Sequence, residues 1–185
     1  LILKYFPGMS ISTVDLSMVL DDAILEYGKE AIKGLYVDYL DLLKTDVKYD
    51  LYRLELGFIT LSLKNLAVHY GIPIISATQL NKTAYRTMDS KSLNLDQVSE
   101  SAKKIDHSDC IFLLIKDSTV EDKVYVKIGK NRSGKSDQSL EFKTNFKYFK
   151  FENGYRVANP DKPDDTSHTT FDKKGGFTGF GIEGF

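Results

Sequence analysis

Apolar residues in the first half of the chain follow two alternating patterns. Short apolar runs bounded by turn residues predict buried strands, and apolar residues at helical spacing predict amphipathic helices. The predicted order is a strand at 1–6, a helix at about 12–28, a strand at 34–43, a helix at 51–70 and a strand at 74–80. Because strands and helices alternate, we expect an α/β fold with a parallel sheet and right-handed crossovers.

Both predicted helices carry signals at their ends. Ser12, with Asp15 three residues later, is typical of a capping pair, and Gly28 predicts where this first helix stops. The longer helix has an apolar stripe that reaches Tyr70, and the following Gly-Ile-Pro sequence predicts its end.

The second half of the chain is predicted to be mainly β. Residues 83–95 are polar and aperiodic, which predicts a mobile loop, and a short helix at about 97–105 then leads to an apolar strand at 110–115. Antiparallel strands that extend the parallel sheet are predicted where apolar and polar residues alternate, at 123–128, 139–143 and 147–151. The Asn153-Gly154 pair predicts a tight turn.

Asp38 and Gln79 are the first candidate functional residues. The run at 34–43 is apolar up to Asp38, so a buried strand would present a carboxylate at its C-terminal end, and Gln79 holds the same place on the next strand. Open α/β sheets bind ligands outside the carboxyl ends of their strands, so Asp38 is placed to hold a metal–nucleotide complex, the Walker B role. The alternative is an aspartate that caps a turn or the next helix.

A sequence that matches the phosphate-binding loop pattern occurs at residues 129–136, Gly-Lys-Asn-Arg-Ser-Gly-Lys-Ser. Such a loop requires a helix after it, so that the helix N-terminus faces the phosphates. The residues that follow alternate like strands. We therefore interpret the segment as a basic β-turn, with Lys130 and Arg132 projecting from a strand end.

Composition narrows the class of protein. The hydrophobic residues, 42% of the chain, are enough to form a core. The net charge is −1, so the whole chain is not a polycation, but its basic residues are concentrated at 116–150, where they can make a local phosphate-binding surface. The lone cysteine, Cys110, is predicted to be a buried small residue. With one cysteine no disulfide can form within the chain, which fits a reducing compartment. No membrane-spanning run or signal peptide is recognisable, and the chain begins without Met inside a strand-like run, so we expect an N-terminally truncated fragment.

From residue 159 onward the hydrophobic periodicity is lost. We therefore expect a partial ATPase core at 1–158 and a disordered tail at 159–185. The phenylalanines of that tail either anchor a partner or have no partner.

Four segments in register resemble the C-terminal ATPase domain of DnaB-type replicative DNA helicases, including phage versions. The resemblance covers about residues 1–151. The first segment is Leu-Tyr-Val-Asp-Tyr-Leu-Asp-Leu-Leu at 35–43. The second is a helix with Ser-Leu-Lys-Asn-Leu-Ala at 62–67, followed by Ile-Pro-Ile-Ile-Ser-Ala-Thr-Gln-Leu-Asn-Lys at 72–82, which contains a strand ending in a glutamine. The other two are Ser-Glu-Ser-Ala-Lys-Lys-Ile-Asp-His-Ser-Asp at 99–109 and Lys-Asn-Arg-Ser-Gly at 130–134. The resemblance implies a RecA-like fold.

The resemblance also implies roles for individual residues. Asp38 would hold the Mg²⁺ of ATP–Mg²⁺, and Gln79 would sense the γ-phosphate. Lys130 and Arg132 would reach a neighbouring subunit's nucleotide, with Arg132 as the arginine finger, because a guanidinium stabilises the charge of the phosphoryl transition state.

Three further residues are implied to contact single-stranded DNA. Lys82 and Arg86 would bind backbone phosphates and Tyr85 would stack on a base, unless the segment is an ordinary solvated loop. The implied protein is a homo-hexamer of the cytoplasm of a bacterial cell or phage-infected host, with a primase or helicase loader as partner and no membrane.

The family's phosphate-binding loop, catalytic glutamate and primase-binding domain would lie N-terminal to the matched region. The fragment alone is therefore expected to be inactive. Two alternatives stay open: a RecA-like recombinase or other strand-binding ATPase, and a non-catalytic fragment that binds DNA or a partner.

Overall fold

The computed structural model places the described residues in two compact units. These residues are 1–45, 51–79, 102–116, 120–136, 138–148 and 150–157. The first unit holds the described α-helices and a small sheet, and the second holds a larger sheet. The predicted loop at 83–95, the start of the predicted helix at 97–105 and the predicted tail at 159–185 lie outside the described residues.

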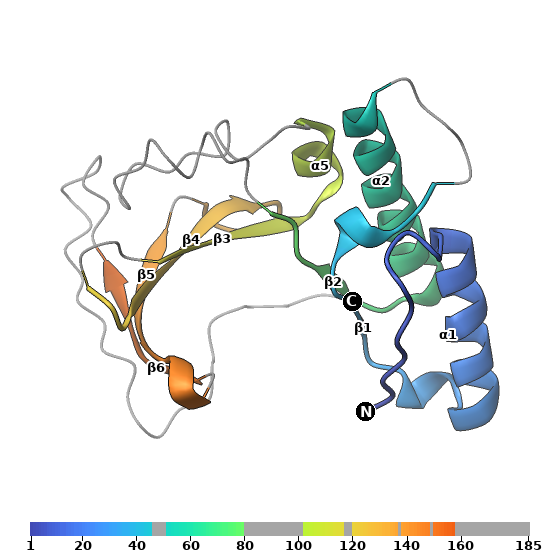
Figure 1. The fold of residues 1–185 in the computed structure, drawn as a ribbon, viewed down its shortest axis with the longest axis horizontal. Coiled ribbons are helices and arrows are strands. Elements are labelled where there is room, and N and C mark those ends of the chain that lie inside the picture. The colour runs from blue at the N-terminus through green and yellow to red at the C-terminus, as the bar shows by residue number, and fades with distance from the viewer. Residues whose placement is uncertain (46–50, 80–101, 117–119, 137, 149, 158–185) are drawn as a thin grey trace. The chain divides into compact units, whose positions relative to one another are not determined.

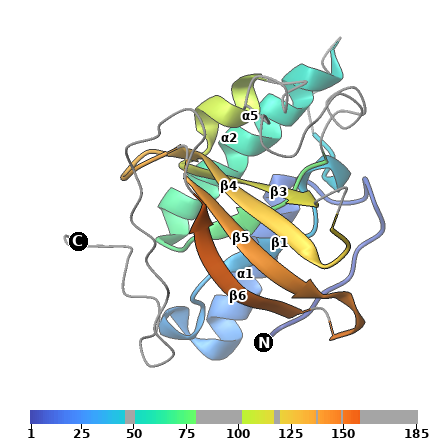
Figure 2. The ribbon, with the colours of Figure 1, turned by 90° about the vertical axis from the view of Figure 1, so that its left-hand side faces the viewer.

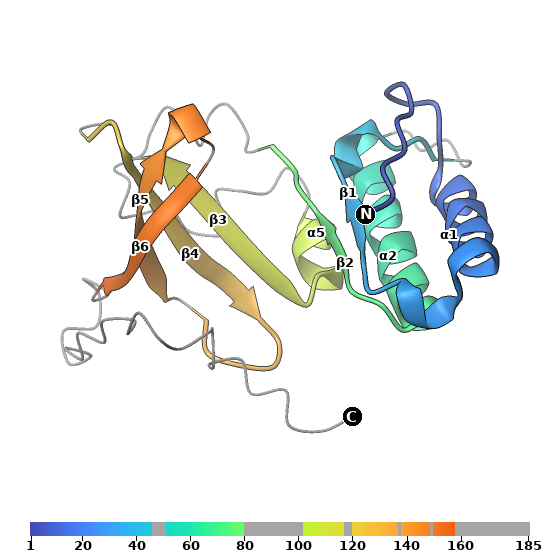
Figure 3. The ribbon, with the colours of Figure 1, turned by 90° about the horizontal axis from the view of Figure 1, so that it is seen from below.

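The first unit is a parallel strand pair with helices packed beside it. Its elements are α1 (Thr13–Tyr27), the 3-10 helix η1 (Lys29–Ala31), β1 (Leu35–Val37), the 3-10 helix η2 (Leu40–Leu42), α2 (Tyr52–Tyr70), β2 (Ile74–Ser76) and α5 (Ala102–His107). β1 and β2 pair in parallel, and α2 connects them in the chain. Figures 1 and 3 show α1 and α2 on the same side of the two strands. The predicted strand–helix–strand order is confirmed for this pair.

α1 begins and ends where the local sequence predicts. The backbone N–H of Ser12 donates to the Asp15 carboxylate at 2.7 Å, and the backbone N–H of Asp15 donates to the Ser12 hydroxyl at 3.4 Å. This reciprocal pair satisfies two backbone donors that a helix start leaves unpaired. At the other end, Gly28 has a φ of +84°, which favours a residue without a Cβ.

One apolar cluster holds α1, η2 and α2 together. Its buried members are Leu16, Leu40, Leu43, Leu56, Ile59 and Leu63, and Val37 and Ile74 of the strands pack against it. Burying one such side chain stabilises a fold by about 1.5–3 kcal/mol. The predicted stripe of the long helix is therefore confirmed. α2 ends at Gly71, which adopts the left-handed conformation.

The predicted strands of the first unit were too long, and one of them is absent. Residues 1–6 form no strand, and their side chains are exposed. An apolar run becomes a strand only beside another strand that satisfies its N–H and C=O groups, and no described strand pairs with this run. β1 stops early because the chain turns into η2 after Tyr39. Tyr36 of β1 is 74% exposed, so the prediction that this strand is buried was also wrong.

The second unit is an antiparallel sheet. Its elements are β3 (Cys110–Lys116), β4 (Lys123–Asn131), β5 (Ser139–Asn145), the 3-10 helix η3 (Phe146–Tyr148) and β6 (Lys150–Val157). The strands lie in the order β3-β4-β5-β6, as Figure 2 shows. The predicted antiparallel strands are confirmed, although the last strand begins after η3 rather than at residue 147. The prediction that they extend the parallel sheet was wrong, because among the described residues β3 to β6 pair only with one another and form a sheet of their own.

Two local predictions in this sheet were wrong. Asn153-Gly154 is no turn: both residues lie inside β6, opposite the single residue Phe142 of β5, which makes a bulge. Cys110 is exposed, with Sγ 3.6 Å from the Asn131 side-chain oxygen. Exposed and covered residues alternate along β3, so the apolar run that suggested full burial has only one covered face.

Tyr70 at the end of α2 ties this helix to α1. Its hydroxyl lies 2.8 Å from a carboxylate oxygen of Asp21 and 3.1 Å from the Ser17 carbonyl oxygen. We expect Tyr70→Phe to lower the free energy of unfolding by about 1 kcal/mol, because it leaves those acceptors without this donor. Chemical denaturation measures this change in the free energy of unfolding. The control is Tyr36→Phe at an exposed position, which should change the free energy of unfolding by less than about 0.5 kcal/mol.

The same hydroxyl gives this prediction a pH dependence. Burial, and then the hydrogen bond to Asp21, raises the pKa of Tyr70 above its usual value of 10.0. A raised pKa in the folded state means that the stability difference between the original chain and Tyr70→Phe is complete below about pH 10 and falls as the pH rises through the folded-state pKa. A difference that grew with pH would contradict the assignment.

Gly154 in β6 has no room for a side chain. A Cβ built there would lie 2.6 Å from Cε1 of Phe142, whose ring packs edge-on against Phe151 at 5.7 Å between centroids. We expect Gly154→Ala to destabilise the sheet by about 1–3 kcal/mol, because the ring must leave its packed position. Denaturation curves measure this loss in the free energy of unfolding. The loss caused by Gly154→Ala should be smaller when Phe142 is replaced by Leu, because the smaller side chain leaves room for the Cβ. An equal loss with Phe142 and with Leu at this position would contradict the clash.

Candidate functional site

The candidate site lies at the carboxyl ends of β1 and β2. Asp38 follows the last residue of β1 directly, and Gln79 follows β2 after two intervening residues. Because the strands are parallel, both residues leave the sheet at the same edge, where α/β proteins bind ligands. Asp38 and Gln79 are both exposed, so a ligand could reach them.

Hydrogen bonds join the two strand ends beyond the ladder. The Ser76 hydroxyl donates to the Val37 carbonyl oxygen at 2.8 Å, and the Leu40 backbone N–H donates to the Ala77 carbonyl oxygen at 3.3 Å. The Gln79 amide nitrogen lies 3.5 Å from the Tyr39 hydroxyl, a long contact. The segments that carry Asp38 and Gln79 are thus attached to each other.

The alternative role of Asp38 as a helix cap does not hold for η2. The N-cap position of η2 is Tyr39, and no side chain makes a capping hydrogen bond there. The Asp38 side chain is therefore not used to start the next helix.

Sequence reasoning missed three polar residues at this edge. Lys104 of α5 places Nζ 2.7 Å from Oδ1 of Asp41 and 2.7 Å from the Thr78 hydroxyl. Asp41 could have been noticed as a second carboxylate three residues after Asp38, but nothing in the local sequence pairs it with Lys104. The contact depends on the fold, which brings α5 beside α2 (Figure 1).

Lys130 and Arg132 lie in the second unit, at the end of β4. Lys130 pairs with Ile111 of β3, and Arg132 starts the turn that leads towards β5. Nη1 of Arg132 is 3.2 Å from Oδ1 of Asp109, and the Arg132 backbone N–H donates to the Asp109 carbonyl oxygen at 2.9 Å. Asp109 is a further residue that the sequence did not single out.

The phosphate-loop look-alike at residues 129–136 is a turn between strands. β4 runs into it, and the next described element is the strand β5, which begins at Ser139, where a phosphate-binding loop would be followed by a helix. The interpretation as a basic β-turn is confirmed.

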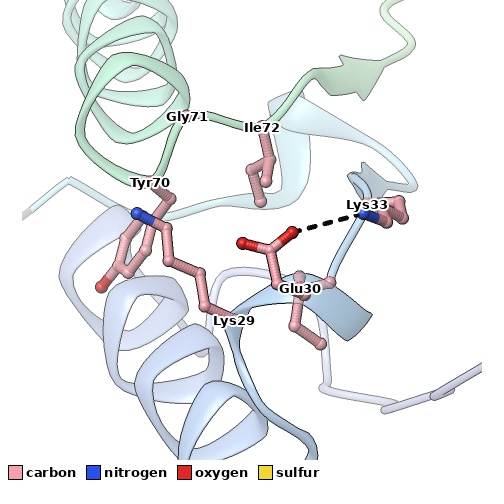
Figure 4. Close-up of a pocket in the computed structure, with 7 residues that line it drawn as sticks. Lys29, Glu30, Lys33, Tyr70, Gly71 and Ile72 are labelled. Atoms are coloured by element: carbon pink, nitrogen blue, oxygen red, sulfur yellow. Dashed lines mark ion pairs between the residues drawn. The ribbon is translucent and has the colours of Figure 1, made fainter.

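A small hollow lies at the opposite edge of the β1–β2 pair (Figure 4). It has a volume of about 140 Å³ and is lined by Lys29, Glu30, Ile32, Lys33, Tyr70, Gly71 and Ile72. These residues precede β1 and β2, so the hollow lies at the amino ends of the strands. Its Glu30–Lys33 ion pair is 3.7 Å long, with both side chains exposed. The hollow is therefore separate from the site of Asp38 and Gln79.

The predicted DNA-binding residues Lys82, Tyr85 and Arg86 lie outside the described residues.

Among the residues that are described, no cluster of three or more metal-ligating side chains occurs, and no helix is both long and apolar enough to cross a membrane. A single carboxylate such as Asp38 still suits Mg²⁺, which commonly uses one or two carboxylates together with phosphate oxygens and water.

A family match covers the range of the chain in which this site lies. The chain matches the family described as "DnaB-like helicase C terminal domain" over residues 11–153. It is 30% identical over 125 residues to the replicative DNA helicase DnaB of Haemophilus influenzae, covering 64% of this chain and 26% of that protein. It is also 34% identical over 106 residues to the replicative DNA helicase DnaB of Pasteurella multocida, covering 54% of this chain and 22% of that protein. The chain spans about a quarter of the length of these relatives.

Solved structures show the same fold. One of them, described as an ATPase domain, matches with a TM-score of 0.68 and 21% identity, over 77% of this chain and 51% of that chain. A second, "The Structure Of A DnaB-Like Replicative Helicase And Its Interactions With Primase", matches with the same score and identity over 77% and 35%. The predicted RecA-like α/β fold is thereby confirmed. With the family match spanning most of the chain, including both strands that carry Asp38 and Gln79, this chain belongs to the DnaB-like helicase C terminal domain family.

Proposed function

We propose that this chain is the C-terminal part of a hexameric, ATP-dependent replicative DNA helicase that translocates on single-stranded DNA. The observation that carries the proposal is the position of Asp38 and Gln79 at the carboxyl ends of adjacent parallel strands. The family match supports it, because both residues lie within the matched range. Primase or a helicase loader would be a further partner, since one similar structure is described with primase.

Asp38 would hold Mg²⁺ together with oxygens of the nucleotide's phosphates. When bound, the metal neutralises charge on the phosphates during phosphoryl transfer. Gln79 would place its amide near the terminal phosphate, so that loss of this phosphate changes its hydrogen bonding. The hydrogen bonds between the strand ends keep these two side chains on segments that move together.

Arg132 would stabilise the transition state in a neighbouring subunit, with Lys130 beside it. Asp109, one of its partners, offers weak competition: the two side chains are 55% and 47% exposed, and ion pairs exposed to water contribute at most about 1 kcal/mol. A triphosphate carries more charge than one carboxylate. The guanidinium can therefore exchange Asp109 for phosphate at small cost.

A subunit-mixing experiment tests the proposal. In the longer helicase of which this chain would be part, Asp38→Asn and Arg132→Ala should each reduce ATP-driven unwinding of a forked duplex by about 10³-fold or more. Mixed hexamers should recover part of the activity, because some interfaces then combine an intact Asp38 with an intact Arg132. Lys135→Ala is the matched control from the same turn and should retain activity.

Three results would contradict this account. Full activity of Arg132→Ala would remove the finger assignment. Loss of ATP hydrolysis in Lys135→Ala would make the turn a phosphate-binding loop after all. Hydrolysis without fork unwinding would point to a recombinase or another strand-binding ATPase.

Lys82 and Arg86 should contribute to DNA affinity through phosphate contacts. We expect replacement of both by Ala to weaken binding to single-stranded oligonucleotides and to reduce the slope of log affinity against log salt concentration by about 1–2. Fluorescence anisotropy across a salt series measures it. The control is Lys29→Ala, in the hollow at the other edge of the strands. If Lys29→Ala changed the salt slope equally, the loss of DNA affinity would reflect the removal of positive charge in general and not contacts by Lys82 and Arg86.

A further inference from the structure

We propose that Lys104 is a positioning residue that fixes the separation between the strand end carrying Asp38 and the strand end carrying Gln79. Its ammonium group forms a hydrogen bond to a residue near each strand end: Nζ lies 2.7 Å from Oδ1 of Asp41 and 2.7 Å from Oγ1 of Thr78. Asp41 lies three residues after Asp38, and Thr78 directly precedes Gln79. The inference rests on the proposed function for the roles of Asp38 and Gln79.

The Lys104–Asp41 pair differs from the surface ion pair between Lys33 and Glu30. Both side chains of the Lys104 pair are only 17% exposed, whereas those of Lys33 and Glu30 are 79% and 95% exposed and 3.7 Å apart. Water screens exposed pairs strongly and partly buried pairs much less. The Lys104–Asp41 pair is therefore better able than the Lys33–Glu30 pair to hold the segments that carry it in fixed positions.

Removing Lys104 should disturb this edge more than an ordinary surface substitution would. The second carboxylate oxygen of Asp41, Oδ2, is buried and has no hydrogen-bond partner among the described residues. Without Lys104, Asp41 would lose the countercharge 2.7 Å from its other oxygen and would have to move towards solvent. Because Asp41 belongs to η2, that movement would displace the segment that follows Asp38.

Small displacements matter at such a site. The proposed metal ligand and the proposed phosphate sensor come from different strands, and misplacement of reacting groups by about 1 Å can cost about 10²-fold in rate. The backbone bond from Leu40 N–H to the Ala77 carbonyl oxygen is long, at 3.3 Å, and gives limited rigidity alone. Lys104 adds a charged connection to the neutral hydrogen bonds that Ser76 and Gln79 make between the same two strand ends.

Amide hydrogen exchange in the 185-residue chain tests the connection without any activity. The Leu40 amide is the probe, since it bonds across the two strand ends. Lys104→Met should increase its exchange rate about tenfold or more. Thr78→Val should cause a smaller increase, and Lys104→Arg, which keeps the charge, should restore most of the protection. The control is Lys123→Met, which removes the Lys123–Glu141 pair of the other unit and should leave Leu40 unchanged.

ATP hydrolysis in the longer helicase tests the positioning role. Lys104→Met should lower kcat about tenfold or more while KM for ATP stays within about twofold, because misplaced groups weaken the transition state more than binding. Lys104→Arg should recover much of the loss, and Lys123→Met should match the original protein.

The outcomes separate the two claims. Unchanged Leu40 exchange in Lys104→Met would overturn the connection, and faster exchange with unchanged kcat would overturn the positioning role. If the original longer protein does not hydrolyse ATP, the proposed function fails, and with it the roles of Asp38 and Gln79. The exchange rates would then still decide whether Lys104 links the two strand ends.

Discussion

The parallel pairing of β1 and β2 is the constraint on which the candidate site depends. Only three residue pairs, from Leu35–Ile74 to Val37–Ser76, set the register. A slip by one residue would turn every side chain of a strand to the other face. It would move Val37 away from the apolar cluster and also displace Asp38 relative to Gln79. The same few hydrogen bonds therefore determine both the packing of the unit and the spacing of its proposed catalytic residues.

So short a ladder needs support from outside the strands. The apolar cluster of α1, η2 and α2 covers one face of the pair. At the carboxyl edge, Ser76, Ala77 and Lys104 add bonds from one strand end to the other. Packing therefore stabilises the interior of the unit, while polar contacts hold the edge that a ligand would approach. This division suits a site whose charged side chains must face solvent.

Sequence reasoning succeeded where the deciding interactions are local. The helix start at Ser12, the stop at Gly71 and the strand-end position of Asp38 each depend on a few neighbouring residues, and the structure has them as predicted. The resemblance to helicase ATPase domains, which depends on motif order, was confirmed by the family match. The roles of individual site residues remain predictions.

The failures concern contacts between distant parts of the chain. The apolar run at 1–6 looks like a strand in isolation but has no described strand beside it. Gly154 signals a turn by its sequence, yet tertiary pairing with Phe142 places it in a bulge. Lys104 meets Asp41 across 63 positions of sequence, and no local pattern encodes such a pair.

The Lys104–Thr78 bond has a consequence for how the chain can vary between relatives. It joins positions 26 residues apart, so the ends of the intervening stretch are held by the folded unit itself. The entropy of closing a stretch grows only with the logarithm of its length, by about 0.6 kcal/mol for each doubling. A change of length between these anchors therefore costs little closure entropy, whereas one inserted residue between Asp38 and Asp41 would carry the carboxylate out of reach of Lys104. The spacing of these two carboxylates in the sequence is therefore constrained by a contact with a residue 63 positions further along the chain.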